Sequence, residues 1–157
     1  MFARLNSPHL GKVVTLFVLA LGIALANAGG AAAKTKQLVF VERASTDTVT
    51  DTGVQGDSVG DILTFTNEIY DRDNKNAVGQ DNGWCVRTAG GKAWECFWTL
   101  VLKDGQITVE GPFYDKGDSV LAVTGGTGAY VGARGEMKLH ARDAKGSEYD
   151  FVYSLNE

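Results

Sequence analysis

Histidine, cysteine and proline are all scarce in this chain of 157 residues, which contains two of each. Beyond the N-terminal segment, His140 is the only histidine that could take part in a catalytic triad or dyad. His140 lies in the alternating segment MKLHAR, where a packed or solvent-facing side chain is the simpler interpretation. No cluster of histidine, cysteine and acidic residues has the spacing of metal ligands. We therefore expect neither a histidine-based triad nor a metal site.

Clusters of positive charge are also missing. The chain has 15 lysines and arginines against 19 acidic residues, which gives a net charge of −4 at pH 7. Without a basic block, neither nucleic acid nor an anionic membrane surface is attracted electrostatically. We expect neither of them as a partner.

Only one long apolar run occurs, over residues 13–25. Arg4 and Lys12 precede it, and an Ala-Asn-Ala tripeptide ending at Ala28 follows it, which is the pattern of a cleavable secretory signal peptide. Cleavage after Ala33 is an alternative. An uncleaved membrane anchor is another alternative, but the run is shorter than the ~20 residues that span a bilayer.

The chain is therefore predicted to have three parts. Residues 1–28 are a signal peptide, residues 29–36 a flexible mature N-terminus, and residues 37–157 one domain. Cleavage removes two basic residues and no acidic one, so the net charge changes from −4 to −6. The expected location is secreted or periplasmic, an oxidising compartment in which disulfides persist.

Short runs rich in β-branched and aromatic residues dominate the chain after residue 36, between clusters of Gly, Asp and Asn. Most connectors have hairpin length, such as Asp104-Gly105 and a looser turn at residues 125–128. Eight strands are predicted, at residues 37–43, 60–71, 77–88, 93–102, 106–113, 118–124, 132–142 and 147–155.

Consecutive hairpins form a meander, and eight such strands can close into a barrel that holds side chains or one small ligand. A two-sheet sandwich is the alternative, but it needs longer Greek-key connections. The prediction is an all-β fold, an eight-stranded antiparallel up-and-down barrel with an interior apolar cavity. In residues 94–102, large apolar side chains occur at both odd and even positions and so point to both faces of the strand. This pattern predicts a second buried face and hence a homo-oligomer. Residues 44–57 are polar and are expected to form a flexible loop or lid at one barrel mouth.

The two cysteines are predicted to face each other. A hairpin centred on residues 89–92 places Cys85 opposite Cys96. Opposed Cβ atoms are typically ~4.5–5.5 Å apart, wider than the ~3.8 Å of a disulfide, whereas an oxidising compartment favours the bond. A disulfide and two free thiols both stay open.

Three polar residues are candidates for an interior site. Glu42 shares one face of its strand with Leu38 and Phe40. A buried carboxyl there needs a partner or a role, unless Glu42 lies at the barrel rim. Asn67 shares the face of Phe65, and an inward amide can hold a water or a ligand oxygen. An outward Asn67 is the alternative.

Cys85 is the third candidate. It shares its face with Arg87 and, across the hairpin, with Trp94. These two residues, with Phe65 and Trp98, form the predicted substrate-binding set. A structural disulfide or a packed thiol is the alternative role for Cys85.

Four segments of the chain resemble plant allene oxide cyclases. TFTNEIY at residues 64–70 is similar to PFTNKLY, and GWCV at residues 83–86 resembles a G-[LI]-C-V pattern, with Trp84 at the Leu/Ile position. Residues 106–114 and 121–139 resemble two further blocks of that family, in the same order. The resemblance implies a small barrel with an apolar substrate inside, no cofactor, and a trimer or dimer.

The same resemblance implies roles for individual residues. Glu42 would be the cavity carboxylate, Asn67 the amide that holds a water, Cys85 the cavity thiol, and Phe65 part of the lining. Two departures affect the water site: Ala44 stands where the cyclases have asparagine, and no proline lies between residue 36 and Pro112. Residues 132–135, GARG, look more like dirigent proteins, which steer radical coupling without oxidising anything themselves.

The function predicted from these features is a cofactor-free cyclase or isomerase for a small apolar or conjugated substrate. A rigid lumen would favour the cyclising conformer, Glu42 would stabilise a developing positive charge, and Asn67 would orient a water or an oxyanion. One alternative is a dirigent-like or carrier protein that performs no bond chemistry. Another is a barrel filled by its own side chains that acts through its surface.

Overall fold

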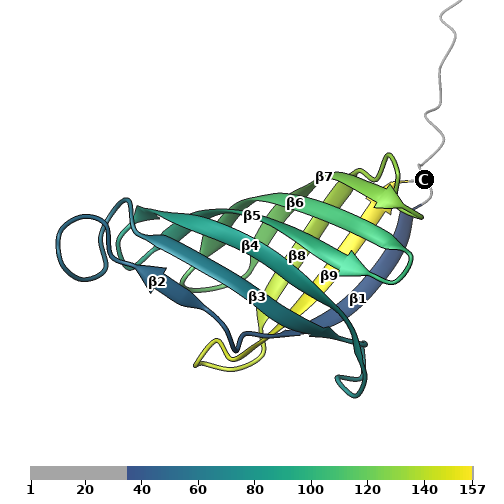
Figure 1. Cartoon of the computed structure of the whole chain (residues 1–157), viewed down its shortest axis with the longest axis horizontal. Helices are drawn as coiled ribbons and strands as arrows, with labels where there is room; N and C mark the ends of the chain where they lie inside the picture. Colours follow the sequence, from purple (N-terminus) through teal and green to yellow (C-terminus); the bar gives the residue numbers. More distant parts are fainter. Residues whose placement is uncertain (1–34, 157) are drawn as a thin grey trace, which may run out of the picture. The chain divides into compact units, whose positions relative to one another are not determined.

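A computed structural model describes residues 35–156, which form nine strands and no helix (Figure 1). None of these residues belongs to a helix that could span a membrane. The predicted signal peptide lies outside the described residues. The strands are β1 (Thr35–Arg43), β2 (Thr48–Thr50), β3 (Ile62–Tyr70), β4 (Ala77–Ala89), β5 (Ala93–Leu102), β6 (Gly105–Tyr114), β7 (Ser119–Gly128), β8 (Gly135–Ala141) and β9 (Glu148–Asn156).

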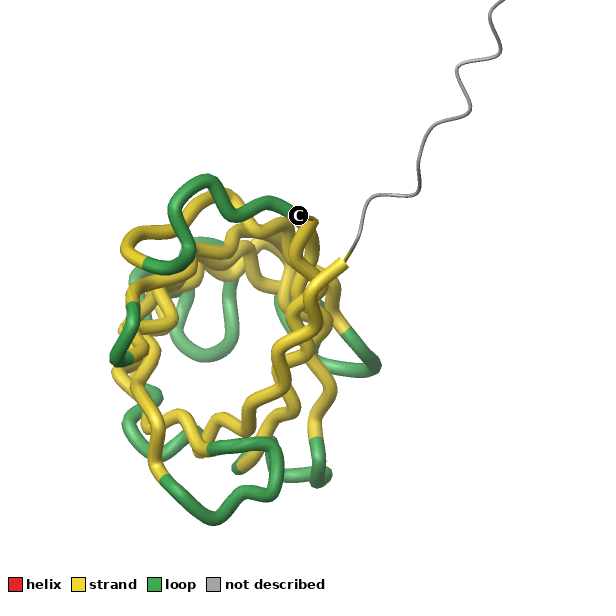
Figure 2. The backbone as a smooth tube through the Cα atoms, turned by 90° about the vertical axis from the view of Figure 1, so that its right-hand side faces the viewer, coloured by secondary structure: helices red, strands yellow, loops and turns green. Residues whose placement is uncertain are grey.

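The strands form one antiparallel sheet that closes on itself. From β3 to β9 each strand pairs with the next in the sequence, and β9 pairs with β1. Closure comes from β1 and β3, where Glu42 lies opposite Ile69. Seen along the barrel, these strands make a complete ring (Figure 2). The predicted eight-stranded up-and-down barrel is confirmed, and the sandwich is excluded.

Several details differ from the prediction, among them the starts of β3 and β8, which lie two and three residues later than expected. The segment 44–57 contains a ninth strand, β2, because Thr-Val-Thr can pair in register with residues 62–64 at the start of β3. β7 runs to Gly128, so the chain turns after residues 125–128 instead of within them. A side chain at Gly126 would collide with the backbone of Tyr130, so close packing and not a turn requires this glycine. Finally, β1 begins at Thr35, two residues before the expected start.

Alternation along the strands fills the barrel. Inward side chains of β5, β6 and β9 such as Leu100, Ile107 and Tyr153 are completely buried. His140 lies on the outside, where its ring contacts Asp118, as its alternating segment indicated. Several outward apolar side chains, including Ile62 and Trp84, stay exposed. These exposed side chains fit the predicted homo-oligomer, which stays a prediction.

Candidate functional site

A cavity of about 30 Å³ lies inside the barrel, next to its only buried carboxyl cluster among residues 35–156. That volume holds one or two water molecules. The cavity wall is largely aromatic and includes Phe65, Trp98, Phe113, Tyr149 and Phe151. Trp98 stacks on Phe151 and meets Phe65 edge to face. The predicted lining roles of Phe65 and Trp98 fit this geometry.

Two buried carboxyl groups, those of Glu42 on β1 and Asp81 on β4, face this cavity. They are close enough that each carboxyl affects the pKa of the other. Neither oxygen of Asp81 receives a hydrogen bond from an N–H or O–H group of the described protein. Two ionised carboxylates at neighbouring positions repel each other, which favours the neutral form of at least one of them.

Electrostatics favour a protonated pair. Burial raises the pKa of Asp81 to about 7. Burial, followed by repulsion from Asp81, raises the pKa of Glu42 well above its usual value. Both shifts favour the neutral form of the carboxyl groups, and a neutral carboxyl can donate a hydrogen bond.

Asn67 on β3 holds this pair and the neighbouring loop in place. Its amide nitrogen donates to Glu42 Oε1 at 2.8 Å and to Asp47 Oδ1 at 2.7 Å. Its oxygen accepts three hydrogen bonds, from the backbone N–H groups of Ser45 and Thr46 and from the Thr46 hydroxyl. With both amide hydrogens engaged inside the protein, Asn67 positions Glu42. It has no donor left for the water that the sequence led us to expect.

Two more polar atoms lie buried without a well-formed hydrogen bond, the Tyr153 hydroxyl and the Trp98 indole nitrogen. Besides these two atoms and the two Asp81 oxygens, only one other buried side-chain nitrogen or oxygen among the described residues lacks a hydrogen-bond partner. Most native buried polar groups are paired, so a group of exceptions marks a place where water or a ligand belongs. Only Trp98 and Asp81 of these residues line the cavity itself.

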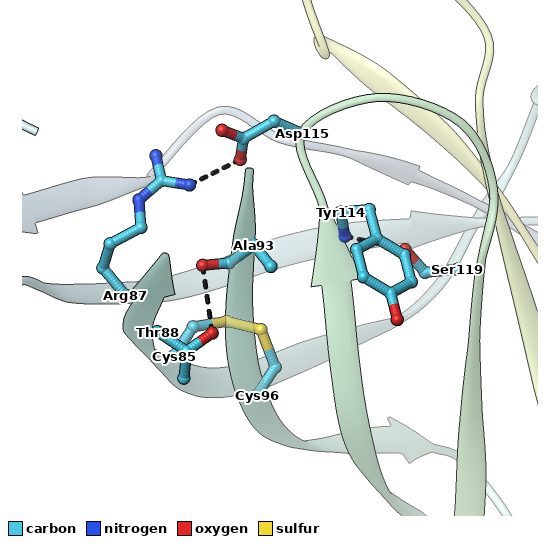
Figure 3. The surroundings of a disulfide bond; sticks show 8 residues. All are labelled: Cys85, Arg87, Thr88, Ala93, Cys96, Tyr114, Asp115 and Ser119. Carbon is cyan, nitrogen blue, oxygen red and sulfur yellow. Dashed lines mark hydrogen bonds and ion pairs between the residues drawn. A yellow bond between two sulfur atoms is a disulfide. The ribbon is translucent and has the colours of Figure 1, made fainter. Parts of the chain in front are cut away.

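Cys85 and Cys96 form a disulfide across the β4–β5 hairpin, with Cα atoms 4.0 Å apart (Figure 3). This resolves the choice left open by the sequence, because the strand pair approaches more closely than typical opposed residues. Both cysteines line the cavity. Cys85 therefore carries no thiol, and the role of cavity thiol is not open to it in this state.

Replacing both Cys85 and Cys96 with alanine is expected to lower the free energy of unfolding by about 3 kcal/mol, because the bond constrains the unfolded chain. Urea denaturation of the double variant and of the wild type measures this difference. The wild type in excess reductant should match the variant. Equal stability of all three samples would mean that the disulfide contributes nothing to the fold.

Arg87 and Trp94 lie near the disulfide but not on the cavity. The Arg87 guanidinium contacts Asp57 and Asp115, at 2.6 Å each, and lies over the Trp94 ring. Figure 3 shows its contact with Asp115. These contacts join the loop before β3 to the turn after β6. Arg87 and Trp94 thus hold together one end of the barrel, and the substrate contact expected of them stays a prediction.

Asp81 is the main site residue that the sequence did not indicate. It lies in the polar run GQDNGW, which suggests a turn more than an interior strand position. Its parity was the available signal, because Asp81 is four residues before Cys85 on the same strand. No group of three or more ligating side chains in residues 35–156 is arranged to hold a metal ion.

Solved structures with this barrel come from several proteins. A pyocyanin demethylase superposes with a TM-score of 0.67 and 23% identity, covering 77% of this chain and all of that one. An exo-specific intermolecular Diels-Alderase, AbnU, matches with a TM-score of 0.64 and 19% identity, over 79% of this chain and 99% of its own. A pterocarpan synthase dirigent protein matches with a TM-score of 0.62 and 14% identity, over 78% of this chain and 83% of its own. At these identities the likeness concerns the fold alone.

The match of the sequence to a family model is more specific than these likenesses of fold. The family model described as allene oxide cyclase matches residues 29–154, which is most of the chain and covers the barrel up to the last two residues of β9. The motifs at residues 64–70 and 83–86 therefore lie in a family-wide match, on the strands that carry Asn67 and Cys85. The chain belongs to the allene oxide cyclase family.

Proposed function

We propose that this protein binds a small apolar, conjugated substrate inside the barrel and catalyses its stereoselective ring closure, with the Glu42–Asp81 pair as the acid. The observation that carries the proposal is a pair of buried carboxyl groups facing an aromatic cavity, where burial raises the pKa of both. A neutral carboxyl in an apolar site donates a hydrogen bond to an oxygen that gains negative charge, and the dry surroundings strengthen that bond.

This role differs from the one expected from the sequence, in which an ionised Glu42 would stabilise positive charge. Burial disfavours the ionised form, so the carboxyl acts as a donor. The aromatic wall would hold the substrate in a conformation close to the product ring, which lowers the entropy cost of closure. No proton is consumed overall, because ring closure by isomerisation returns the proton to the pair.

Export is part of the proposal, resting on residues 1–28 and on a disulfide that suits an oxidising compartment. So is a homo-oligomer, resting on the exposed apolar side chains outside the barrel. Neither is needed for the acid chemistry.

The test is chiral analysis of the cyclopentenone formed when purified protein is added to an unstable eighteen-carbon allene oxide made in situ. That substrate closes without a catalyst to a racemate, so an enantiomeric excess that grows with protein concentration supports the proposal. A racemate at every concentration contradicts it for this substrate. Phenoxyl radicals generated by an added oxidant test the dirigent-like alternative, which predicts stereoselective coupling independent of Glu42.

A further inference from the structure

Asp47 is the one exposed residue among those that line the interior cavity. It belongs to residues 44–47, which connect the end of β1 to the start of β2. The other lining residues are buried or half-buried members of strands. A third carboxyl, besides those of Glu42 and Asp81, therefore reaches the cavity, and this one stays in contact with solvent.

The connection is bound to β3, which gives Asp47 a fixed place. The backbone N–H groups of Ser45 and Thr46 donate to Asn67 Oδ1, at 3.0 Å each. The Thr46 hydroxyl accepts from the backbone N–H of Thr66 at 2.8 Å. Thr66 and Asn67 are neighbours in β3, so the residue just before Asp47 is held at two successive positions of that strand.

Asn67 also joins Asp47 to Glu42. Its amide nitrogen donates to Asp47 Oδ1 at 2.7 Å and to Glu42 Oε1 at 2.8 Å. The two N–H bonds of an amide diverge by about 120°, so the oxygens that accept from them lie about 5 Å apart. Two carboxyl groups at that separation affect each other's ionisation.

No positive charge offsets this arrangement. Among residues 35–156, no lysine, arginine or histidine lines the cavity. The other titratable side chains that face the pair are Tyr149 and Tyr153, and burial raises the pKa of both, that of Tyr149 to about 12. Burial is the main cause of the raised pKa of Glu42 and of Asp81, and repulsion from Asp47 adds to both.

Exposure decides which carboxyl carries the charge. Water solvates an ionised Asp47, whereas Glu42 and Asp81 would have to ionise in a buried site. When three neighbouring carboxyl groups compete, the solvated one takes the negative charge. That charge then favours the neutral form of the other two.

We propose that Asp47 is a positioning residue whose negative charge, held beside Glu42 by Asn67, keeps the Glu42–Asp81 pair in its neutral, hydrogen-bond-donating form. The use of that form as an acid rests on the proposed function. The electrostatic effect rests on the contacts of Asp47, Asn67 and Glu42, and it is measured without a substrate.

Asp47→Asn tests this role, because it removes the charge and keeps the shape. The new amide oxygen can still accept from Asn67. The pKa of Asp81, about 7 in the fold, should fall by roughly one unit in this variant. Titration of the carboxyl carbon-13 chemical shifts by NMR measures the change, and Asp81→Asn identifies the signal.

Asp51→Asn is the matched control, because Asp51 is an exposed aspartate of the same polar segment that does not line the cavity. It should leave the titration of the pair unchanged. Asp47→Glu retains the charge and should keep the titration close to that of the wild type. Thermal melting verifies the fold of each variant, and Asp47→Ser carries the same test if the asparagine variant does not fold.

Three results would overturn the inference. The first is an unchanged titration when the charge of Asp47 is removed, and the second is an equal shift in the Asp51 control. The third is an equal shift in Asp47→Glu, which would assign the effect to a lost contact instead of a lost charge.

The same variants separate this inference from the proposed function. If the neutral pair is the acid, the enantiomeric excess of the ring-closure product should decline about one pH unit earlier in Asp47→Asn than in the wild type as the pH rises. A shifted NMR titration together with a racemic product at every pH would refute the cyclase alone and support the role of Asp47.

Discussion

Glu42→Gln is expected to abolish stereocontrol while leaving the barrel folded. Glutamine has the shape of glutamate and can still accept from Asn67, but it is a much poorer proton donor than a carboxylic acid. Loss of one such donor typically slows a reaction by about 10²–10³-fold. The uncatalysed route would then dominate, and because that route is racemic, the enantiomeric excess should fall to near zero.

Chiral chromatography of the product, alongside thermal melting of the same samples, measures both quantities. Glu110→Gln is the matched control, since Glu110 is an exposed glutamate on the outside of β6. A variant at Glu42 that keeps the wild-type enantiomeric excess would remove the acid from the mechanism. A variant that unfolds would make Glu42 a structural residue, and Asp81→Asn would then have to carry the test of the acid.

Asp81→Asn is expected to change how stability depends on pH. The pKa of Asp81 is about 7 in the fold against an ordinary value of 3.8, so between these values the folded state binds more protons than the unfolded chain. The free energy of unfolding of the wild type therefore falls as the pH rises through that window. Asparagine does not titrate, so the variant loses this dependence.

The difference in free energy of unfolding between variant and wild type should be smallest near pH 4. It should grow in favour of the variant up to about pH 8. At 1.36 kcal/mol per pKa unit, the growth is at most about 4 kcal/mol. Urea denaturation at a series of pH values gives the two curves. Asp104→Asn, at an exposed turn position, controls for loss of a carboxylate at the surface. Parallel curves for wild type and Asp81→Asn would show that Asp81 ionises normally and is not part of a protonated pair.

These two variants separate catalysis from stability at one site. Glu42 and Asp81 destabilise the fold when ionised, because no cation lies beside them among their interacting groups. A protein that keeps two acids in an apolar interior without a counter-charge loses stability through them. We infer that the acids are retained for their chemistry, as strongly shifted pKa values in a cavity commonly indicate.

Much of the fold could be predicted because strands of a barrel repeat with a local period. Alternation in segments such as MKLHAR and ILTFTNEIY, together with hairpin turns such as Asp104-Gly105, located all eight barrel strands to within a few residues. The turn expected at residues 125–128 lies after them, because β7 runs to Gly128. Gly126 lies against the chain at Tyr130, a close contact that no local pattern locates.

The site was predictable only in part. Parity placed Glu42, Phe65 and Asn67 on the inner face, and the structure has all three there. Arg87 has the same inward parity as Cys85, yet its position along the strand brings it to the barrel end, where it contacts Asp57 and Asp115. Parity specifies the face of a strand and not the depth along the barrel, which depends on how the strands are staggered.

Local pattern was thus sufficient for the all-β class, the strand order and the inward face of each strand, since each follows from alternation and from turns between neighbours in the chain. The raised pKa values of the carboxyl pair could not be predicted from local pattern. Glu42 and Asp81 come from β1 and β4, which are not paired with each other, and they meet only because β1 closes on β3. Their pKa values depend on that meeting and on exclusion of water, and both are properties of the closed barrel.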